Sequence, residues 1–316
     1  MTETCSVQSK KLFRILSLDG GGGKGIYSLG VLRELERTVG TSLNQHFDLF
    51  YGTSTGAIIA SALAKGVTIA DIIEFYYKDL PTIMKCFCAS TRSERLRSCL
   101  RAFFGDDTFS SLGNIGLGVV ATNLHEKKPL IFKSLPSLAH GMKHSFDPGF
   151  GLTLAEALEA SCSATPFFAP KSLNLKNASR IDAIDGGFVA NNPSLYALID
   201  ARKALNIEDT NIRLLSVGTG MYPEKYPIYS YLSGFKLGPA LKIISTQFAS
   251  SANSIHSIFR LLANDVSYVR VNDTFADPQL TTSLFEHRKA ILERLLGKGR
   301  DSFAQQESDI KKTIVL

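Results

Sequence analysis

The chain has 316 residues, 44% of them hydrophobic and 20% charged, and its 35 Lys and Arg against 29 Asp and Glu give a net charge of +6. This composition is typical of globular proteins and excludes a disordered chain, a collagen and a disulfide scaffold. The chain has five cysteines, no long apolar run and no apolar core near its start. We therefore expect a reduced, cytoplasmic protein with no transmembrane helix and no secretory signal.

Short apolar runs alternate with helical periodicities, which predicts an α/β fold in which helices flank a sheet. In chain order we expect a strand at 13–18, a helix at 26–38, a strand at 48–51, a helix at 55–65, a helix capped by Thr68 and Asp71, strands at 115–121 and 130–133, a helix capped by Thr153 and Glu156 that stops before Pro166, a strand at 180–184, a helix at 194–205, a strand at 212–217, a helix at 254–262, a strand at 266–271, and helices at 282–296 and after Asp301. Segments 135–151 and 221–238 are predicted to be irregular. We expect a single domain over 1–316, with a motif-bearing core at 13–220 and a helical C-terminal part at 239–316.

A glycine-rich turn follows the first predicted strand. Residues 19–25 read Asp-Gly-Gly-Gly-Gly-Lys-Gly, and a predicted helix comes next. Glycines let the backbone approach a ligand closely, and the helix behind them presents unpaired N–H groups, so the turn is a candidate anion-binding loop. Its possible donors are the N–H groups of Gly20, Gly21, Gly22, Gly23, Lys24 and Gly25.

The same turn satisfies G-x-G-x-x-G through Gly20, Gly22 and Gly25, so a dinucleotide-binding protein is an alternative function. That alternative requires an acidic residue at the end of the second strand, where this chain has Gly-Thr-Ser at 52–54. A Walker-type phosphate loop is excluded because a glycine, not Ser or Thr, follows Lys24.

Gly52, Ser54 and Gly56 have the spacing of a nucleophile elbow, in which a sharp turn from strand to helix exposes a serine hydroxyl. The predicted strand at 48–51 and helix at 55–65 supply that context. The elbow and the glycine loop both leave parallel strands at the carboxyl edge of the sheet, where ligands bind. A serine that attacks an ester creates an oxyanion, and glycine N–H groups are donors of the kind that stabilise it.

The base that activates Ser54 has two kinds of candidate. A Ser-Asp-His order would use His256 or His287, but both are expected inside helices rather than in strand-end loops. Asp185 ends a predicted strand and precedes two glycines, so it is the favoured base. A free Asp has a pKa of about 3.9, and burial would raise that pKa towards the range useful for proton transfer.

These motifs resemble those of patatin-like phospholipases, whose signatures are D-G-G-G-x-[KR]-G, G-x-S-x-G and D-G-[GA]. They stand here in the same order at 19–25, 52–56 and 185–187, the last being Asp185, Gly186 and Gly187. The resemblance spans about residues 13–220. It implies a three-layer α/β sandwich with a mainly parallel central sheet, a Ser54–Asp185 dyad, an oxyanion hole in the glycine loop, and hydrolysis of lipid acyl esters.

Segments 140–151, 159–168, 273–287 and 295–307 also resemble the bacterial effector phospholipases of anti-phage signalling systems. This resemblance implies activation by a cyclic dinucleotide, typically cyclic GMP–AMP, and attack on membrane phospholipids at the inner face of the cell membrane. We expect no metal or cofactor for the chemistry and no DNA or RNA partner, and leave open a homo-oligomer on activation. A catalytically silent protein on the same fold is disfavoured because Ser54 and Asp185 are both present.

Two apolar features have open interpretations. The predicted basic helix near residue 100 carries an apolar stripe, which either rests on an anionic bilayer or packs on the core, the commoner arrangement. The stripe consists of Leu96, Leu100, Phe103 and Phe104. The pair Phe167 and Phe168 either lines an acyl channel or fills the core.

Overall fold

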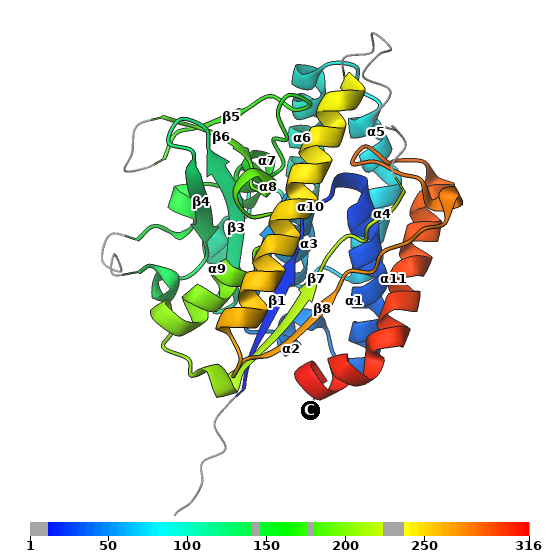
Figure 1. The fold of residues 1–316 in the computed structure, drawn as a ribbon. Coiled ribbons are helices and arrows are strands. Elements are labelled where there is room, and N and C mark those ends of the chain that lie inside the picture. Colours follow the sequence, from blue (N-terminus) through cyan, green and yellow to red (C-terminus); the bar gives the residue numbers. More distant parts are fainter. Residues whose placement is uncertain (1–11, 141–145, 176–179, 224–236, 316) are drawn as a thin grey trace, which may run out of the picture.

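A computed structural model describes residues 12–140, 146–175, 180–223 and 237–315 (Figure 1). Its strands are β1 (Phe13–Leu18), β2 (Leu49–Thr53), β3 (Gly116–Asn123), β4 (Lys128–Lys133), β5 (Lys171–Leu173), β6 (Ile181–Asp185), β7 (Ile212–Val217) and β8 (Ser267–Val271). Its α-helices are α1 (Gly25–Val39), α2 (Leu43–His46), α3 (Thr55–Ala64), α4 (Ile69–Lys78), α5 (Leu80–Met84), α6 (Ala89–Phe104), α7 (Leu154–Ser161), α8 (Gly187–Ala190), α9 (Ser194–Ile199), α10 (Leu237–Leu262) and α11 (Lys289–Ile310).

The strands form one sheet in the order β5-β6-β3-β2-β1-β7-β8, with β4 also paired to β3. The pairs among β3, β2, β1, β7 and β8 are parallel. The pairs that bring in β4, β5 and β6 are antiparallel. The register places Leu18 beside both Gly52 and Val217, and Ala121 beside Asp185. The glycine loop, the serine elbow and the D-G-G motif therefore all leave the sheet at one edge, as the predicted α/β fold requires.

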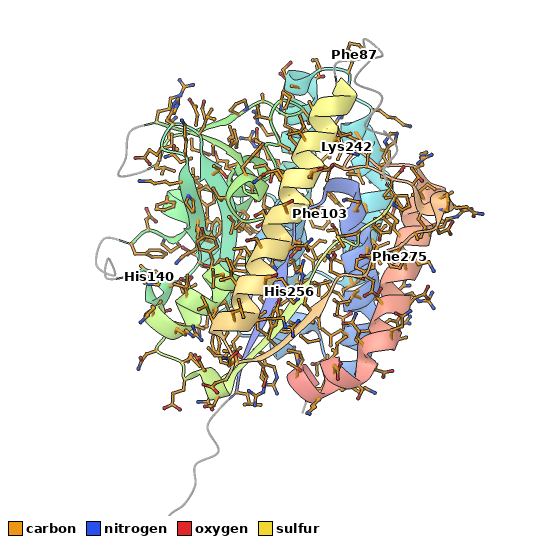
Figure 2. The ribbon with its side chains drawn as sticks, viewed as in Figure 1. Phe87, Phe103, His140, Lys242, His256 and Phe275 are labelled. Atoms are coloured by element: carbon orange, nitrogen blue, oxygen red, sulfur yellow. The ribbon has the colours of Figure 1, made fainter. Side chains whose placement is uncertain are left out.

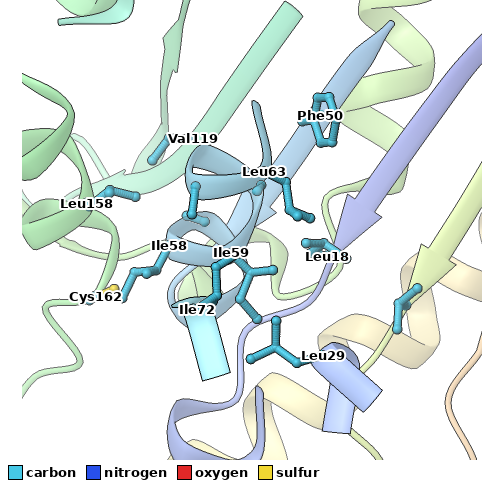
Figure 3. Close-up of a cluster of buried hydrophobic side chains, with 14 of the residues drawn as sticks. Leu18, Leu29, Phe50, Ile58, Ile59, Leu63, Ile72, Val119, Leu158 and Cys162 are labelled. Atoms are coloured by element: carbon cyan, nitrogen blue, oxygen red, sulfur yellow. The ribbon is translucent and has the colours of Figure 1, made fainter. Parts of the chain in front are cut away.

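Helices cover both faces of the sheet, so the predicted three-layer arrangement is confirmed (Figure 1). On one face α3 packs on the central strands, and α1, α4 and α11 lie beyond it, whereas α8, α9 and α10 cover the other face. Side chains alternate along β1, so that Leu16 joins the larger core around α3 and Ile15 joins the smaller core behind it. Figure 3 shows part of the larger core, in which Ile58 and Ile59 of α3 lie among apolar side chains from neighbouring elements.

The helix predicted at 254–262 is too short, because α10 begins at Leu237. The apolar pattern continues upstream: Leu241, Ile244 and Phe248 are buried against the larger core, one helical turn apart. Of the two segments predicted to be irregular, residues 141–145 and 224–236 lie outside the described part of the chain.

The helix predicted at 282–296 is wrong over its first turns, since α11 begins at Lys289 and continues past Asp301 to Ile310. The side chain of Glu286 accepts hydrogen bonds from the backbone N–H groups of His287 and Arg288. These N–H groups are thus satisfied without a preceding helical turn, and the helix starts only after them.

The remaining predicted elements differ from the structure by a few residues at their ends, with one exception. The helix predicted at 194–205 ends at Ile199, and a π-helical turn occupies Asp200–Ala204. The apolar stripe of α6 packs inward, because Leu96, Leu100 and Phe104 are buried. Across the described ranges, no helix combines the length and the apolar character that crossing a membrane would require.

Candidate active site

Ser54 occupies a strained turn between β2 and α3, with φ 53° and ψ −124°. Its backbone N–H donates to Ser161 Oγ at 2.8 Å, and the Ser161 hydroxyl donates to the carbonyl oxygen of Val120 at 2.6 Å. A side chain at Gly56 would collide with the backbone carbonyl oxygens of Leu18 and Asp19. Glycine at 56 therefore lets α3 start against the end of β1, which gives the predicted elbow its sharp turn.

The side chains of Ser54 and Asp185 are in direct contact. Ser54 Oγ donates to Asp185 Oδ2 at 2.7 Å, and the backbone N–H of Gly187 donates to Asp185 Oδ1 at 2.7 Å. The backbone of Asp185 is also fixed by hydrogen bonds. Its N–H donates to the carbonyl oxygen of Ser163, and its carbonyl oxygen accepts from the hydroxyl of Thr122. The carboxyl group is thus fixed in one orientation, with one oxygen facing the serine hydroxyl.

Burial raises the pKa of Asp185 to about 7, against the opposing effect of the hydrogen bonds from Gly187 and Ser54. Only 1% of this residue is exposed. A carboxyl group with a pKa near 7 is ionised in part at neutral pH, and it can both take and return a proton there. The expectation that burial raises the pKa of this aspartate is confirmed.

Neither late histidine hydrogen-bonds to Ser54 or Asp185 in the described structure. His256 lies in the lower half of α10, as predicted, and its Nδ1 is 2.9 Å from the hydroxyl of Tyr268 (Figure 2). The prediction that His287 lies inside a helix is wrong, because it precedes α11, and its Nδ1 faces the carbonyl of Phe285.

Most N–H groups of the glycine loop of residues 20–25 already have an acceptor, inside the loop or in a neighbouring segment. Backbone carbonyls accept from Gly20, Gly23, Lys24 and Gly25. Among the described residues, no acceptor faces the N–H groups of Gly21 and Gly22, and both residues line the same cavity as Ser54. Of the six predicted donor positions, these two have no described acceptor, and they are the two that we expect to face an oxyanion.

Gly22 has φ +58°, and a Cβ atom there would meet the carbonyl oxygen of Leu284. Only glycine fits this combination of backbone angle and close approach. The same Leu284 carbonyl also accepts a hydrogen bond from the N–H of Gly23. The segment before α11 therefore contacts the glycine loop and helps to fix its conformation.

An apolar cavity opens beside Ser54. The cavity is lined mainly by aliphatic and aromatic side chains, including those of Leu80, Ile83, Leu96, Phe167 and Phe168. Both phenylalanines are 6% exposed and pack near Phe285. They therefore belong to the hydrophobic core and also line the cavity. A chamber of this kind suits a hydrocarbon chain and gives an apolar acyl group a place next to the serine hydroxyl.

Three residues of the site lay outside the sequence predictions: Ser161, Leu284 and Arg270. Ser161 and Leu284 fall in segments 159–168 and 273–287, whose family resemblance was the available signal. Arg270 forms a buried ion pair with Asp19, and no local sequence pattern marked it.

Around the described residues, no group of three or more His, Cys, Asp or Glu is arranged to hold a metal ion.

The chain is similar in sequence to known phospholipases. The family model for patatin-like phospholipase matches residues 16–198. An Escherichia coli protein described as a cUMP-AMP-activated phospholipase is 38% identical over 302 residues, which cover 96% of this chain and 94% of that protein. A cGAMP-activated phospholipase of Escherichia coli strain TW11681 is 31% identical over 68% of this chain and 64% of that protein. The crystal structure of VipD from Legionella pneumophila matches with a TM-score of 0.47 and 13% identity, over 96% of this chain and 67% of that one.

Proposed function

The chain belongs to the patatin-like phospholipase family, and on that premise we propose how its own residues carry out and control the reaction. It is a serine hydrolase that cleaves carboxylic esters of phospholipids. The proposal concerns the roles of Ser54 and Asp185, the donors to the oxyanion, and the activating ligand.

In the first half of the reaction, Ser54 Oγ attacks the acyl carbonyl carbon while its proton passes to Asp185 Oδ2. The carbonyl oxygen becomes an oxyanion, and the N–H groups of Gly21 and Gly22 stabilise it. The tetrahedral intermediate then expels the lysolipid alkoxide, which takes the proton from Asp185. The acyl chain stays in the apolar cavity as an ester of Ser54.

In the second half, a water molecule replaces the lysolipid. Asp185 removes a proton from the water, whose oxygen attacks the acyl carbon, and the same glycine N–H groups stabilise the second oxyanion. Collapse of that intermediate breaks the bond to Ser54 Oγ, which regains its proton from Asp185. The products are a fatty acid and the enzyme in its starting state.

The single observation that carries this mechanism is the 2.7 Å hydrogen bond from Ser54 Oγ to a buried carboxyl group, beside two N–H groups with no described acceptor. The test uses a fluorophosphonate probe and vesicles of defined phospholipids, with the Ser54→Ala variant as the matched control. We expect the probe to label Ser54 in the wild type, and the variant to fold normally and release no fatty acid. Labelling of another serine, or activity in the variant, contradicts the assignment.

We further propose that a cyclic dinucleotide activates the enzyme. This is supported by the relatives described as cUMP-AMP-activated and cGAMP-activated phospholipases, the first of which aligns along nearly the whole chain. Fatty-acid release should therefore be low without nucleotide and rise with cyclic UMP–AMP or cyclic GMP–AMP. Full activity in the absence of either nucleotide, unchanged on adding it, rejects the activation.

We also propose where the enzyme acts and in which oligomeric form. Its phospholipid substrate requires action at a membrane surface, and we infer the inner face of the cell membrane in an anti-phage response. We propose that residues 1–316 act as one domain, with assembly into a homo-oligomer on activation as a further step. Support for one domain comes from α11, which packs along α1, and from β8, which joins the same sheet as β1.

A further inference from the structure

A second cavity, larger than the apolar one, also borders the glycine loop. Its wall includes Gly20 and Lys24 of the loop, residues 219–222 after β7, one face of α10, and residues 282–284. The catalytic steps described above use none of its polar side chains. It is therefore a candidate ligand site separate from the acyl chamber.

Two cationic side chains lie at this cavity. Lys24 and Lys242 line it, and Lys242 lies in the upper half of α10 (Figure 2). Among its described lining residues Asp19 is the one acid, and the guanidinium of Arg270 neutralises it at 2.6 Å. The lining hydroxyl and amide groups, such as those of Thr219 and Asn253, add hydrogen-bond donors.

Two buried polar atoms at the cavity wall have no described partner. They are the side-chain oxygen of Asn191, a residue 5% exposed, and the hydroxyl of Tyr222. The Asn191 amide nitrogen donates to the carbonyl of Gly20, which leaves its oxygen as an acceptor. A buried polar atom without a partner is costly. The Asn191 oxygen can only accept, so it suits a ligand N–H group, whereas the Tyr222 hydroxyl can donate or accept.

We propose that this cavity binds the activating cyclic dinucleotide, with its phosphodiester groups near Lys24 and Lys242 and a nucleobase N–H facing Asn191. This inference rests on the proposed activation. A phospholipid headgroup also carries a phosphodiester, but the unpartnered acceptor of Asn191 beside several amides favours a ligand with base edges.

The position of the cavity gives bound nucleotide a route to the catalytic groups. Leu284 lines both cavities, and its carbonyl braces Gly23 beside the two oxyanion donors. Phe248 of α10 also lines both, and its ring packs against Gly187, whose N–H holds Asp185. A ligand that contacts α10 and residues 282–284 therefore acts on the walls that fix the donors and the base.

The test compares Lys242→Ala with Arg260→Ala, which removes the same charge from an exposed position on α10 outside the cavity. Calorimetry measures binding of cyclic UMP–AMP and cyclic GMP–AMP. Fatty-acid release from phospholipid vesicles is then followed against nucleotide concentration, beside hydrolysis of a phosphate-free ester.

We expect Lys242→Ala to weaken nucleotide binding about tenfold or more, the scale of one lost charged contact. The half-activating concentration should rise in parallel, with the plateau of activity unchanged. Lys242→Arg should restore binding in part, and Arg260→Ala should resemble the wild type.

Two results would overturn the proposal, and they are distinguishable from each other. Unchanged nucleotide affinity in Lys242→Ala, with a higher KM for phospholipid alone, would assign the cavity to the lipid headgroup. Failure of the wild type to bind either nucleotide would instead remove the proposed activation itself, and the nucleotide site with it.

Discussion

The guanidinium of Arg270 donates two hydrogen bonds to the carboxylate of Asp19, of 2.6 and 3.2 Å, and both side chains are almost fully buried. Arg270 also donates to the hydroxyl of Ser216 on β7. Because Asp19 is the last residue before the glycine loop, this ion pair ties the start of the loop to β8. We therefore assign Asp19 a positioning role, since its carboxylate pairs with Arg270 and makes no described hydrogen bond to Ser54 or Asp185.

Replacing Arg270 by Gln should destabilise the protein by about 3–5 kcal/mol, because it leaves the Asp19 charge buried and unpaired. Turnover should fall more than KM rises, since the loop carries groups that act on the transition state. Denaturant unfolding and steady-state kinetics measure the two effects. The double variant Asp19→Asn/Arg270→Gln removes the unpaired charge, and it should regain stability if this reasoning holds. A single variant as stable and as active as the wild type would contradict the positioning role.

The reaction should depend on pH through Asp185. Its pKa is raised to about 7 by burial, and only the ionised form accepts the proton of Ser54. We expect kcat/KM for a phosphate-free ester to rise with pH, with a midpoint near 7 and a plateau above it. Asp185→Asn should lower turnover by roughly 10²–10⁴-fold and abolish that rise.

His256→Ala is the control for this profile, because His256 hydrogen-bonds to Tyr268 rather than to the dyad. The midpoint should stay in place in that variant. A profile that moves with His256 and ignores Asp185 would point to a triad with a histidine base.

Stability should depend on pH in the opposite sense to activity. Asp185 has a higher pKa in the folded protein, about 7, than its unperturbed value of 3.8, so folding favours its protonated form. This contribution is fully present below about pH 4 and is lost as pH rises through 7, a change on the order of 4 kcal/mol. Thermal unfolding from pH 5 to 8 should therefore show a steeper loss of stability in the wild type than in Asp185→Asn. Parallel curves for the two proteins would show that the carboxyl group titrates normally.

The sequence predicted the catalytic edge of the sheet well, because local rules determine it. Strand periodicity located β1 and β7 at their observed bounds, and glycine spacing located both the loop and the elbow. Parallel pairing brings the glycine loop and the elbow to one sheet edge, whereas Asp185 reaches Ser54 because the antiparallel strand β6 ends beside Ala121 of β3.

The parts that escaped prediction depend on contacts between distant segments. The apolar residues of 282–288 have helical spacing, yet a turn at 284–285 and the Glu286 side chain satisfy the backbone here, so the helix starts only at Lys289. Ser161 and Arg270 act through partners more than 100 residues away, at separations of 107 and 251. Such pairings are tertiary and leave no periodic signal in the chain.

A substitution at Gly22 tests the oxyanion donors. In Gly22→Ala the new Cβ would meet the carbonyl oxygen of Leu284, which belongs to the backbone and cannot rotate away, and φ +58° is unfavourable for alanine. The backbone should then shift, so that the N–H groups of Gly21 and Gly22 no longer point towards the oxyanion. Loss of one such donor typically costs about 10²–10³-fold in turnover, with little change in KM because the donors act on developing charge. Gly40→Ala is the matched control, since Gly40 also has a positive φ, +71°, but has open space around it and lies at the C-terminal end of α1, away from the glycine loop. That variant should lose about 1 kcal/mol of stability and keep its turnover. Steady-state kinetics and the rate of fluorophosphonate labelling of Ser54 measure the effect, and thermal unfolding checks the fold. Wild-type turnover in Gly22→Ala would exclude this loop as the source of the oxyanion donors.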